Sequence, residues 1–189
     1  MNTENYLGLT ESFDATVTRG GSNNESVDTY GVYHVECFDS EGNLKWSDKA
    51  DNLVTTLGKN LLLDNALTSP ATSSTVYLGL KGTGTAVIGD TMGSHAGWVE
   101  VGTANAPTYT APRKTLTFSA ASAGVKATSS TNTFAILTTG TVAGCFLNIN
   151  GTSAVDNTTG TLFSAGDFSA SKNVSNGDTV AVTYSLTLT

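Results

Sequence analysis

The sequence predicts an all-β protein, an antiparallel β-sandwich or jelly-roll-like fold with one short helix and an extended N-terminal arm. Charged residues make up only 13% of the 189 residues, and Thr, Ser, Gly and Asn, which suit pleated surfaces and turns, take their place. Apolar and polar residues alternate in short runs, the period of a half-buried strand, and turn residues separate these runs. The clearest run ends the chain and places on one face Val180, Val182, Tyr184, Leu186 and Leu188.

The chain divides into an N-terminal segment, residues 1–29, and a single β-rich domain, residues 30–189. The N-terminal segment is polar and acidic, with Gly and Asn around "RGGSNNES". One alternating run in it, "FDATVT", places Phe13, Ala15 and Val17 on one face, which indicates an extended arm or an edge strand. A disordered leader is an equally good interpretation of this composition.

The domain begins with a predicted β-hairpin and continues into the predicted helix. "YGVYHVECFD" and "LKWSDK" flank the turn "SEGN", in which Gly42 and Asn43 can take positive φ. The helix is expected over "NLVTTLGKNLLLDNAL", with Thr55 or Thr56 as its N-cap, although Gly58 lowers its helix propensity. Its apolar side is expected to contain Leu57, Leu61, Ala66 and Leu67.

A strand and then a long irregular stretch follow the helix. In "TVYLGLK", Val76, Leu78 and Leu80 are expected to point inward. Residues 82–112 have the length of a functional or binding loop. Within them, Asp90 can cap a single helical turn across "TMGSHA" before "GWVEV" returns to strand.

Four more predicted strands precede the terminal one: "RKTLTFSA", with Leu116 and Phe118 on one side, "TNTFAILTT", "TVAGCFLNIN" and "GTLFSAGDFSA". The chain is therefore expected to contain about eight or nine strands. The terminal strand needs partners for its backbone groups. Either it lies centrally in the sheet, or its Thr-rich face and a free edge meet another subunit, and the sequence leaves both possibilities open.

Composition argues against two classes of partner. The net charge is −7 and the nine Lys and Arg residues are scattered, so no basic patch is expected to bind nucleic acid. No apolar run approaches the roughly 20 residues of a membrane span.

The N-terminus lacks the features of a secretion signal, so we expect synthesis in a cytoplasm. In that reducing environment, Cys37 and Cys145 are expected to be buried thiols.

The two histidines do not suggest a catalytic or metal site. His34 lies on the opposite strand face from Cys37, so the two residues cannot easily share a metal ion. His95 directly follows Ser94 in "MGSHAG", which is not the nucleophile elbow of hydrolases.

The acidic residues give no stronger signal. "DSEGN" begins like a calcium loop, but Leu44 and Ala50 stand where that loop requires Gly and Glu. We interpret Asp39, Glu41 and Asp48 as a solvated hairpin tip. The sequence therefore predicts that the protein is not an enzyme and has no catalytic residue, metal ion or cofactor.

Several stretches resemble, as an ordered set, a family of small virion proteins of tailed bacteriophages. They are "NLVTTLGKNLLLDNAL", "VYLGLKGTG", "GDTMGSHAGWVEV", "PTYTAPRKTLTFSAAS", "GTVAGCFL" and "GTLFSAGDFSASKNVSNGDTVAVTYSLTL". The similarity covers residues 30–189. It implies a capsid decoration, or cement, protein that binds the major capsid protein on the outer surface of the head shell and stabilises capsomer junctions. A tail or fibre component with a receptor-binding role is the alternative, although Tyr109 is the one candidate platform for a sugar in the long loop.

This resemblance leads to a hypothesis about contact residues. We expect the N-terminal arm and the loop from Asp90 to Trp98 to contact the shell or a neighbouring copy, with self-association as a dimer or trimer. Trp98 would be a buried anchor at that interface, or it would pack in the core of its own chain. The candidate interface residues are Phe13, Val17, Asp90, Met92, His95, Trp98, Leu186 and Leu188.

Overall fold

The computed structural model describes residues 27–67, 74–110 and 112–189. Within them, antiparallel strands and one helix confirm the all-β prediction. The elements in chain order are β1 (Thr29–Phe38), β2 (Leu44–Val54), α1 (Thr56–Leu67), β3 (Val76–Gly84), β4 (Trp98–Glu100), β5 (Lys114–Thr115), β6 (Val125–Ala127), β7 (Asn132–Ala135), β8 (Gly140–Ile149), β9 (Thr161–Val174) and β10 (Thr179–Leu188). The predicted arm, with Phe13 and Val17, lies outside the described residues apart from its last three positions, 27–29.

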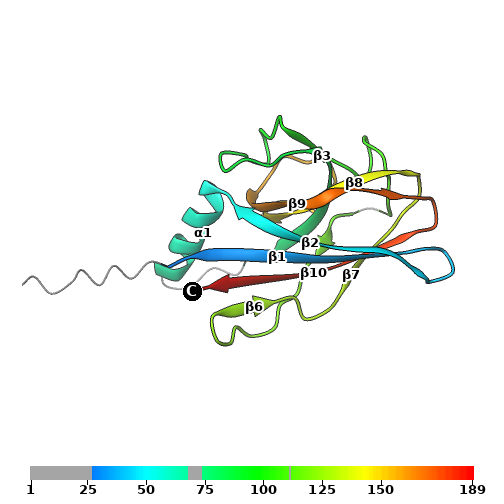
Figure 1. Ribbon diagram of the computed structural model, residues 1–189. Coiled ribbons are helices and arrows are strands. Elements are labelled where there is room, and N and C mark those ends of the chain that lie inside the picture. Colours follow the sequence, from blue (N-terminus) through cyan, green and yellow to red (C-terminus); the bar gives the residue numbers. More distant parts are fainter. Residues whose placement is uncertain (1–26, 68–73, 111) are drawn as a thin grey trace, which may run out of the picture.

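The strands form two halves joined through β2 (Figure 1). The strand order is β4-β3-β8-β9-β2-β1-β10-β6, with β5 paired to β3 and β7 paired to β10. The first part of β2 pairs with β1, whereas Asn52–Val54 pair with β9. One core therefore receives side chains from both halves, such as Tyr33 and Val35 from β1 and Leu78 and Leu147 from β3 and β8.

The predicted hairpin is confirmed, and a side chain shapes its turn. The carboxylate of Asp39 accepts hydrogen bonds from the backbone N–H groups of Glu41 (3.0 Å) and Asn43 (2.8 Å), and Gly42 has a φ of 86°. The side-chain amide of Asn43 also donates to the Asp39 carboxylate at 3.0 Å, and this bond, followed by the one from the backbone N–H of Asn43, lowers the pKa of Asp39 below its usual value. Asp39 therefore has a local role in the turn.

The helix has one of the two expected N-caps, but Asn52–Val54 of the predicted helical run belong to β2, and the helix docks differently from the prediction. Thr55 is the N-cap, because its Oγ1 accepts a hydrogen bond from the N–H of Gly58 at 3.0 Å. A Cβ on Gly58 would lie 2.3 Å from the carbonyl oxygen of Phe163 in β9, so the helix approaches the sheet through its glycine. The expected apolar side is therefore wrong at Leu57 and Leu67, which are 42% and 84% exposed, and at Ala66, which is also exposed; only Leu61 is half-buried.

We expect Gly58→Ala to destabilise the protein by about 1–3 kcal/mol, the usual cost of overpacking. Alanine favours a helix by about 1 kcal/mol over glycine, but its Cβ would press on the carbonyl of Phe163, which also accepts the N–H of Thr55. Urea unfolding measures the change. Asn60→Ala, at an exposed position of the same helix, is the control and should be neutral or slightly stabilising. Equal stabilisation by both variants would contradict this account of docking.

The terminal strand lies centrally, which resolves the choice that the sequence left open. β10 pairs along its whole length with β1, and its other edge pairs with β7 and β6. Even the ends are tied, because Asp28 and Thr189 exchange two backbone hydrogen bonds at 2.8 and 3.0 Å. The backbone groups of β10 are therefore satisfied within the chain. Leu186 is half-buried against the core and Leu188 is 44% exposed.

Candidate functional site

The loop between β3 and β4 folds around the carboxylate of Asp90. Its Oδ2 accepts hydrogen bonds from the backbone N–H of Val87 and from the indole N–H of Trp98, both at 2.9 Å. The expected helical turn is absent at this place, because Thr91 and Ser94 exchange backbone hydrogen bonds in a tight turn. The side chain of Asp90 thus accepts the N–H of Val87, which precedes it in the chain, and the prediction that Asp90 caps a following helical turn is wrong.

Trp98 packs inside its own chain. It is 3% exposed and belongs to a small buried cluster with Met92, with Phe146 of β8 and with two residues of β9, Leu162 and Ala165. The ring of His95 stacks on it with centroids 4.0 Å apart, and Nδ1 of His95 lies 3.1 Å from the carbonyl oxygen of Trp98. Core packing, one of the two expectations for Trp98, therefore describes its environment. Of the four candidate interface residues in this loop, Asp90, Met92 and Trp98 are buried and His95 is partly exposed.

A buried lysine ties this loop to the sheet. The Lys81 side chain is fully buried, and its Nζ donates to Asp167 and to the carbonyl of Gly84, both at 2.5 Å. Lys81 and Asp167 lie on opposite sides of Gly144 in register. A Cβ on Gly144 would lie 2.9 Å from the Lys81 methylenes, so the missing side chain lets the lysine cross β8.

A second buried ion pair holds the remaining loops. The guanidinium of Arg113 donates to both carboxylate oxygens of Glu100, at 2.8 and 2.6 Å, and these residues are 1% and 5% exposed. Arg113 also donates to the carbonyls of Thr152 and Asn157, and the N–H of Asp156 donates to Glu100 at 2.9 Å. Sequence reasoning missed both ion pairs. The available signal was that Lys81 and Arg113 lie in or beside apolar strand-like runs, where a buried charge needs a partner of opposite charge.

Tyr109, the candidate sugar platform, is not available on the surface. It is 2% exposed and packs edge-on against Phe134 with ring centroids 4.8 Å apart. Burial raises the pKa of its hydroxyl, and the nearby charge of Glu100 adds to this effect. The structure therefore removes the residue on which the sugar-stacking alternative depended.

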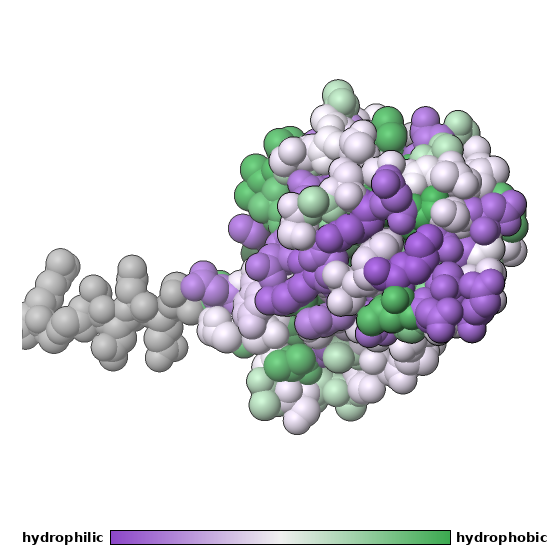
Figure 2. Space-filling view, turned by 45° about the vertical axis from the view of Figure 1, so that its right-hand side comes forward, coloured by the Kyte–Doolittle hydropathy of each residue, from purple (hydrophilic) through white to green (hydrophobic). Residues whose placement is uncertain are grey.

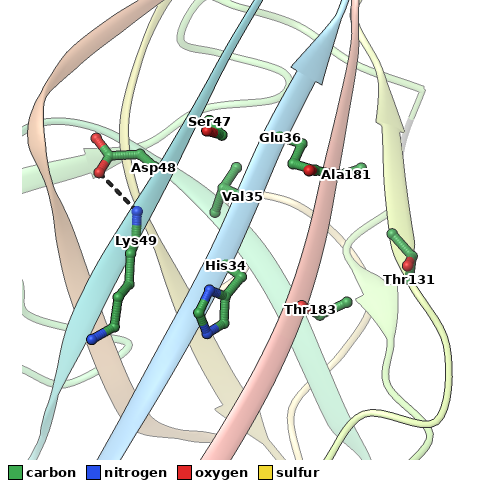
Figure 3. A pocket seen from close by; sticks show the side chains of 9 residues that line it. All are labelled: His34, Val35, Glu36, Ser47, Asp48, Lys49, Thr131, Ala181 and Thr183. Atoms are coloured by element: carbon green, nitrogen blue, oxygen red, sulfur yellow. Dashed lines mark hydrogen bonds between the residues drawn. The ribbon is translucent and has the colours of Figure 1, made fainter. Parts of the chain in front are cut away.

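A polar groove of about 530 Å³ lies on the outer face of β1, β2 and β10 (Figure 3). His34 lies in register with Lys49 of β2 and Thr183 of β10, and Glu36 lies in register with Ser47 and Ala181. The alternation of β1 turns these side chains away from the core. Figure 2 shows hydrophilic residues in bands across the side of the molecule that it presents. The groove therefore offers hydrogen-bonding groups and charges of both signs.

Both cysteines are free and buried, as expected. Burial raises the pKa of the Cys37 thiol to about 11, and the negative charge of Asp178 adds to the effect. Burial also raises the pKa of Cys145. We expect a thiol-specific reagent at mildly alkaline pH to leave the folded protein unmodified and to label both residues in denaturant, because the thiolate is the reactive form. Rapid labelling of the native protein, followed by mass spectrometry, would contradict this prediction.

Within the described residues, no three His, Cys, Asp or Glu side chains gather as a metal-binding group. No helix in the same ranges is both long and apolar enough to cross a bilayer. Comparisons with protein-family models, with curated proteins and with solved structures find no match to this chain.

Proposed function

We propose that this chain is a structural virion protein of a tailed bacteriophage, a capsid decoration protein that binds the major capsid protein on the outer surface of the head shell. It is made in the cytoplasm of the bacterial host and stabilises capsomer junctions. The resemblance of residues 30–189 to small virion proteins motivates this function. Repetition of a modest contact over a shell multiplies its stabilising effect, as in multivalent binding.

The observation that carries the proposal is the unequal distribution of polarity over the surface. The outward positions of β10 are Thr179, Ala181, Thr183, Ser185 and Thr187, and the groove beside them is polar. Leu57, Leu63 and Leu67 of α1 are exposed at the end of the molecule where β1 starts (Figure 1), and further exposed leucines, such as Leu44 and Leu137, lie singly on other parts of the surface. A body with a hydroxyl-rich face and an apolar end is suited to attach at one end and to stay solvated elsewhere.

In the stretches that resemble phage virion proteins, several polar and aromatic residues are buried and hold the long loop against the sheet. In "GDTMGSHAGW", Met92 and Trp98 belong to the small cluster and Asp90 accepts the indole N–H of Trp98. Arg113 begins the Arg-led stretch and forms a buried ion pair. These side chains position the loop, and its contact with a shell would use the exposed Val87 and other surface atoms. Phe13, Val17, His95, Leu186 and Leu188 stay predicted contact residues, and a dimer or trimer stays the predicted assembly.

The copy number of the protein in purified particles tests this function. Quantitative mass spectrometry against the major capsid protein should give a ratio near one or a simple fraction of it, as for a lattice protein. A handful of copies would instead indicate the tail or fibre location, and absence from the particle would overturn the virion proposal. Heat challenge of particles with and without the protein then tests cementing, and undecorated particles should release their DNA at a lower temperature.

A further inference from the structure

Among the described residues, Lys81 is the only lysine with a fully buried side chain. Its Nζ donates to Oδ1 of Asp167 and to the carbonyl of Gly84, both at 2.5 Å. The same nitrogen lies 5.8 Å from the centre of the Trp98 ring, and Trp98 is itself buried. The amine of Lys81 is therefore held out of contact with solvent and directly against a carboxyl group.

Three strands and a glycine place the two groups together. Lys81 in β3 and Asp167 in β9 both lie in register with Gly144 in β8, the strand between them. A Cβ on Gly144 would lie 2.1 Å from the carbonyl oxygen of Gly166 and 2.9 Å from the Lys81 methylenes. The lysine can therefore cross β8 only because this position has no side chain.

Burial distinguishes this pair from other close lysine–aspartate pairs of the described chain. Lys45 and Asp178 also lie 2.5 Å apart, but the Lys45 side chain is 31% exposed. Lys172 lies 2.9 Å from Asp48 and is 22% exposed. Contact with water stabilises the charged ammonium, which is not a nucleophile, whereas desolvation favours the neutral and reactive amine. The pair in the sheet is therefore the one placed for a reaction of the amine.

We propose that Lys81 and Asp167 condense into an intramolecular isopeptide bond that links β3 covalently to β9. The ammonium first passes a proton to Oδ1 along the existing hydrogen bond. The carboxyl group then turns its face to Nζ, and the nitrogen lone pair attacks Cγ. A second proton passes from the nitrogen to Oδ1, the Cγ–Oδ1 bond breaks and Oδ1 leaves as water. One hydrogen stays on the amide nitrogen, and the reaction consumes no other molecule.

Neighbouring groups fit each part of this reaction. The N–H of Ala86 donates to Oδ2 of Asp167 at 3.4 Å, where negative charge develops as Nζ attacks. The carbonyl of Gly84 accepts a hydrogen of Nζ and so fixes the direction of the amine. The Asp167 side chain is 35% exposed, which lets its carboxyl group turn and gives the released water a way out.

The bond would constrain a large part of the chain. Residues 81 and 167 are 86 positions apart, and the covalent loop between them includes β4 to β8. A cross-link over a long loop stabilises the fold by restricting the unfolded chain. This inference goes beyond the proposed function and does not depend on it, because it concerns the isolated chain.

Mass spectrometry of the purified, denatured full-length chain tests the bond. The wild type should be lighter than its sequence by about 18 Da, the mass of one water molecule. Trypsin should leave residues 60–113 joined to residues 127–172, because an acylated Lys81 is not cleaved, and fragmentation should place the link at Lys81 and Asp167. A wild-type chain with its full sequence mass, or a mass deficit that maps to other residues, would overturn the proposal.

Substitutions check that the deficit comes from these two side chains. Lys81→Met and Asp167→Ala should each restore the full mass expected for the variant. Lys45→Met is the matched control, because it removes the exposed lysine of an equally short pair, and it should keep the deficit. A deficit that persists in Lys81→Met would contradict the assignment.

The decisive measurement uses the wild type, so poor folding of a variant does not affect it. It also uses no particles, so failure of the isopeptide proposal and failure of the virion proposal are distinguishable.

Discussion

Replacing Arg113 with methionine is expected to lower the free energy of unfolding by about 3–5 kcal/mol, the usual result of removing one partner of a buried ion pair. The substitution leaves Glu100 buried at 5% exposure with its charge uncompensated. The carbonyls of Thr152 and Asn157 also lose their donor. Urea unfolding followed by intrinsic fluorescence measures the change.

The double variant Arg113→Met/Glu100→Leu distinguishes the cost of leaving one buried charge unpaired from the cost of losing the packing of the two side chains. Because it removes both charges, it should recover most of the lost stability, and the coupling between the sites should be large. Lys49→Met is the control for an exposed pair: Lys49 and Asp51 lie 3.3 Å apart but are 57% and 75% exposed. Its effect should stay below about 1 kcal/mol. A single Arg113→Met variant as stable as the wild type would contradict the assigned role.

Trp98→Ala is expected to destabilise the protein by about 3–5 kcal/mol, the cost of truncating a large buried ring. The ring contacts Phe146, with centroids 5.3 Å apart, and supports the stacked ring of His95. Trp98→Phe keeps most of this contact but removes the N–H that Asp90 accepts. We expect it to cost about 1–3 kcal/mol, the penalty of a buried acceptor that loses a donor.

The comparison of these two variants distinguishes packing from hydrogen bonding. Asp90→Ala in the wild-type background removes the acceptor of the same bond, together with that of the Val87 N–H, and should cost at least as much as Trp98→Phe. Val99→Ala is the matched control on β4, because Val99 is 45% exposed and faces away from the cluster. It should change stability by less than about 0.5 kcal/mol. Equal effects of Trp98→Ala and Val99→Ala would show that the cluster does not hold the loop.

The sequence pattern correctly predicted those features that depend only on residues close together in the chain. The hairpin at Asp39–Asn43 follows from turn residues, and Thr55 is recognisable as an N-cap because both depend on a few adjacent residues. The alternation over Val180–Tyr184 correctly assigned the inward face of β10, because a strand turns successive side chains to opposite sides.

Contacts between distant segments required the tertiary structure. The pairing of Arg113 with Glu100 and of Lys81 with Asp167 depends on how loops and strands meet, which periodicity does not encode. Trp98 illustrates the same limit, since its sequence context fitted an interface anchor and a core residue equally well.

The sequence by itself determined the fold class, the main strands and the position of the helix, because these follow from propensity and period. The tertiary structure alone decided that β10 is central, that α1 docks through Gly58 and leaves Leu63 and Leu67 exposed, and that the long loop surrounds Trp98. The physical reason is that burial and strand pairing are properties of two segments together, so one segment's composition cannot specify them.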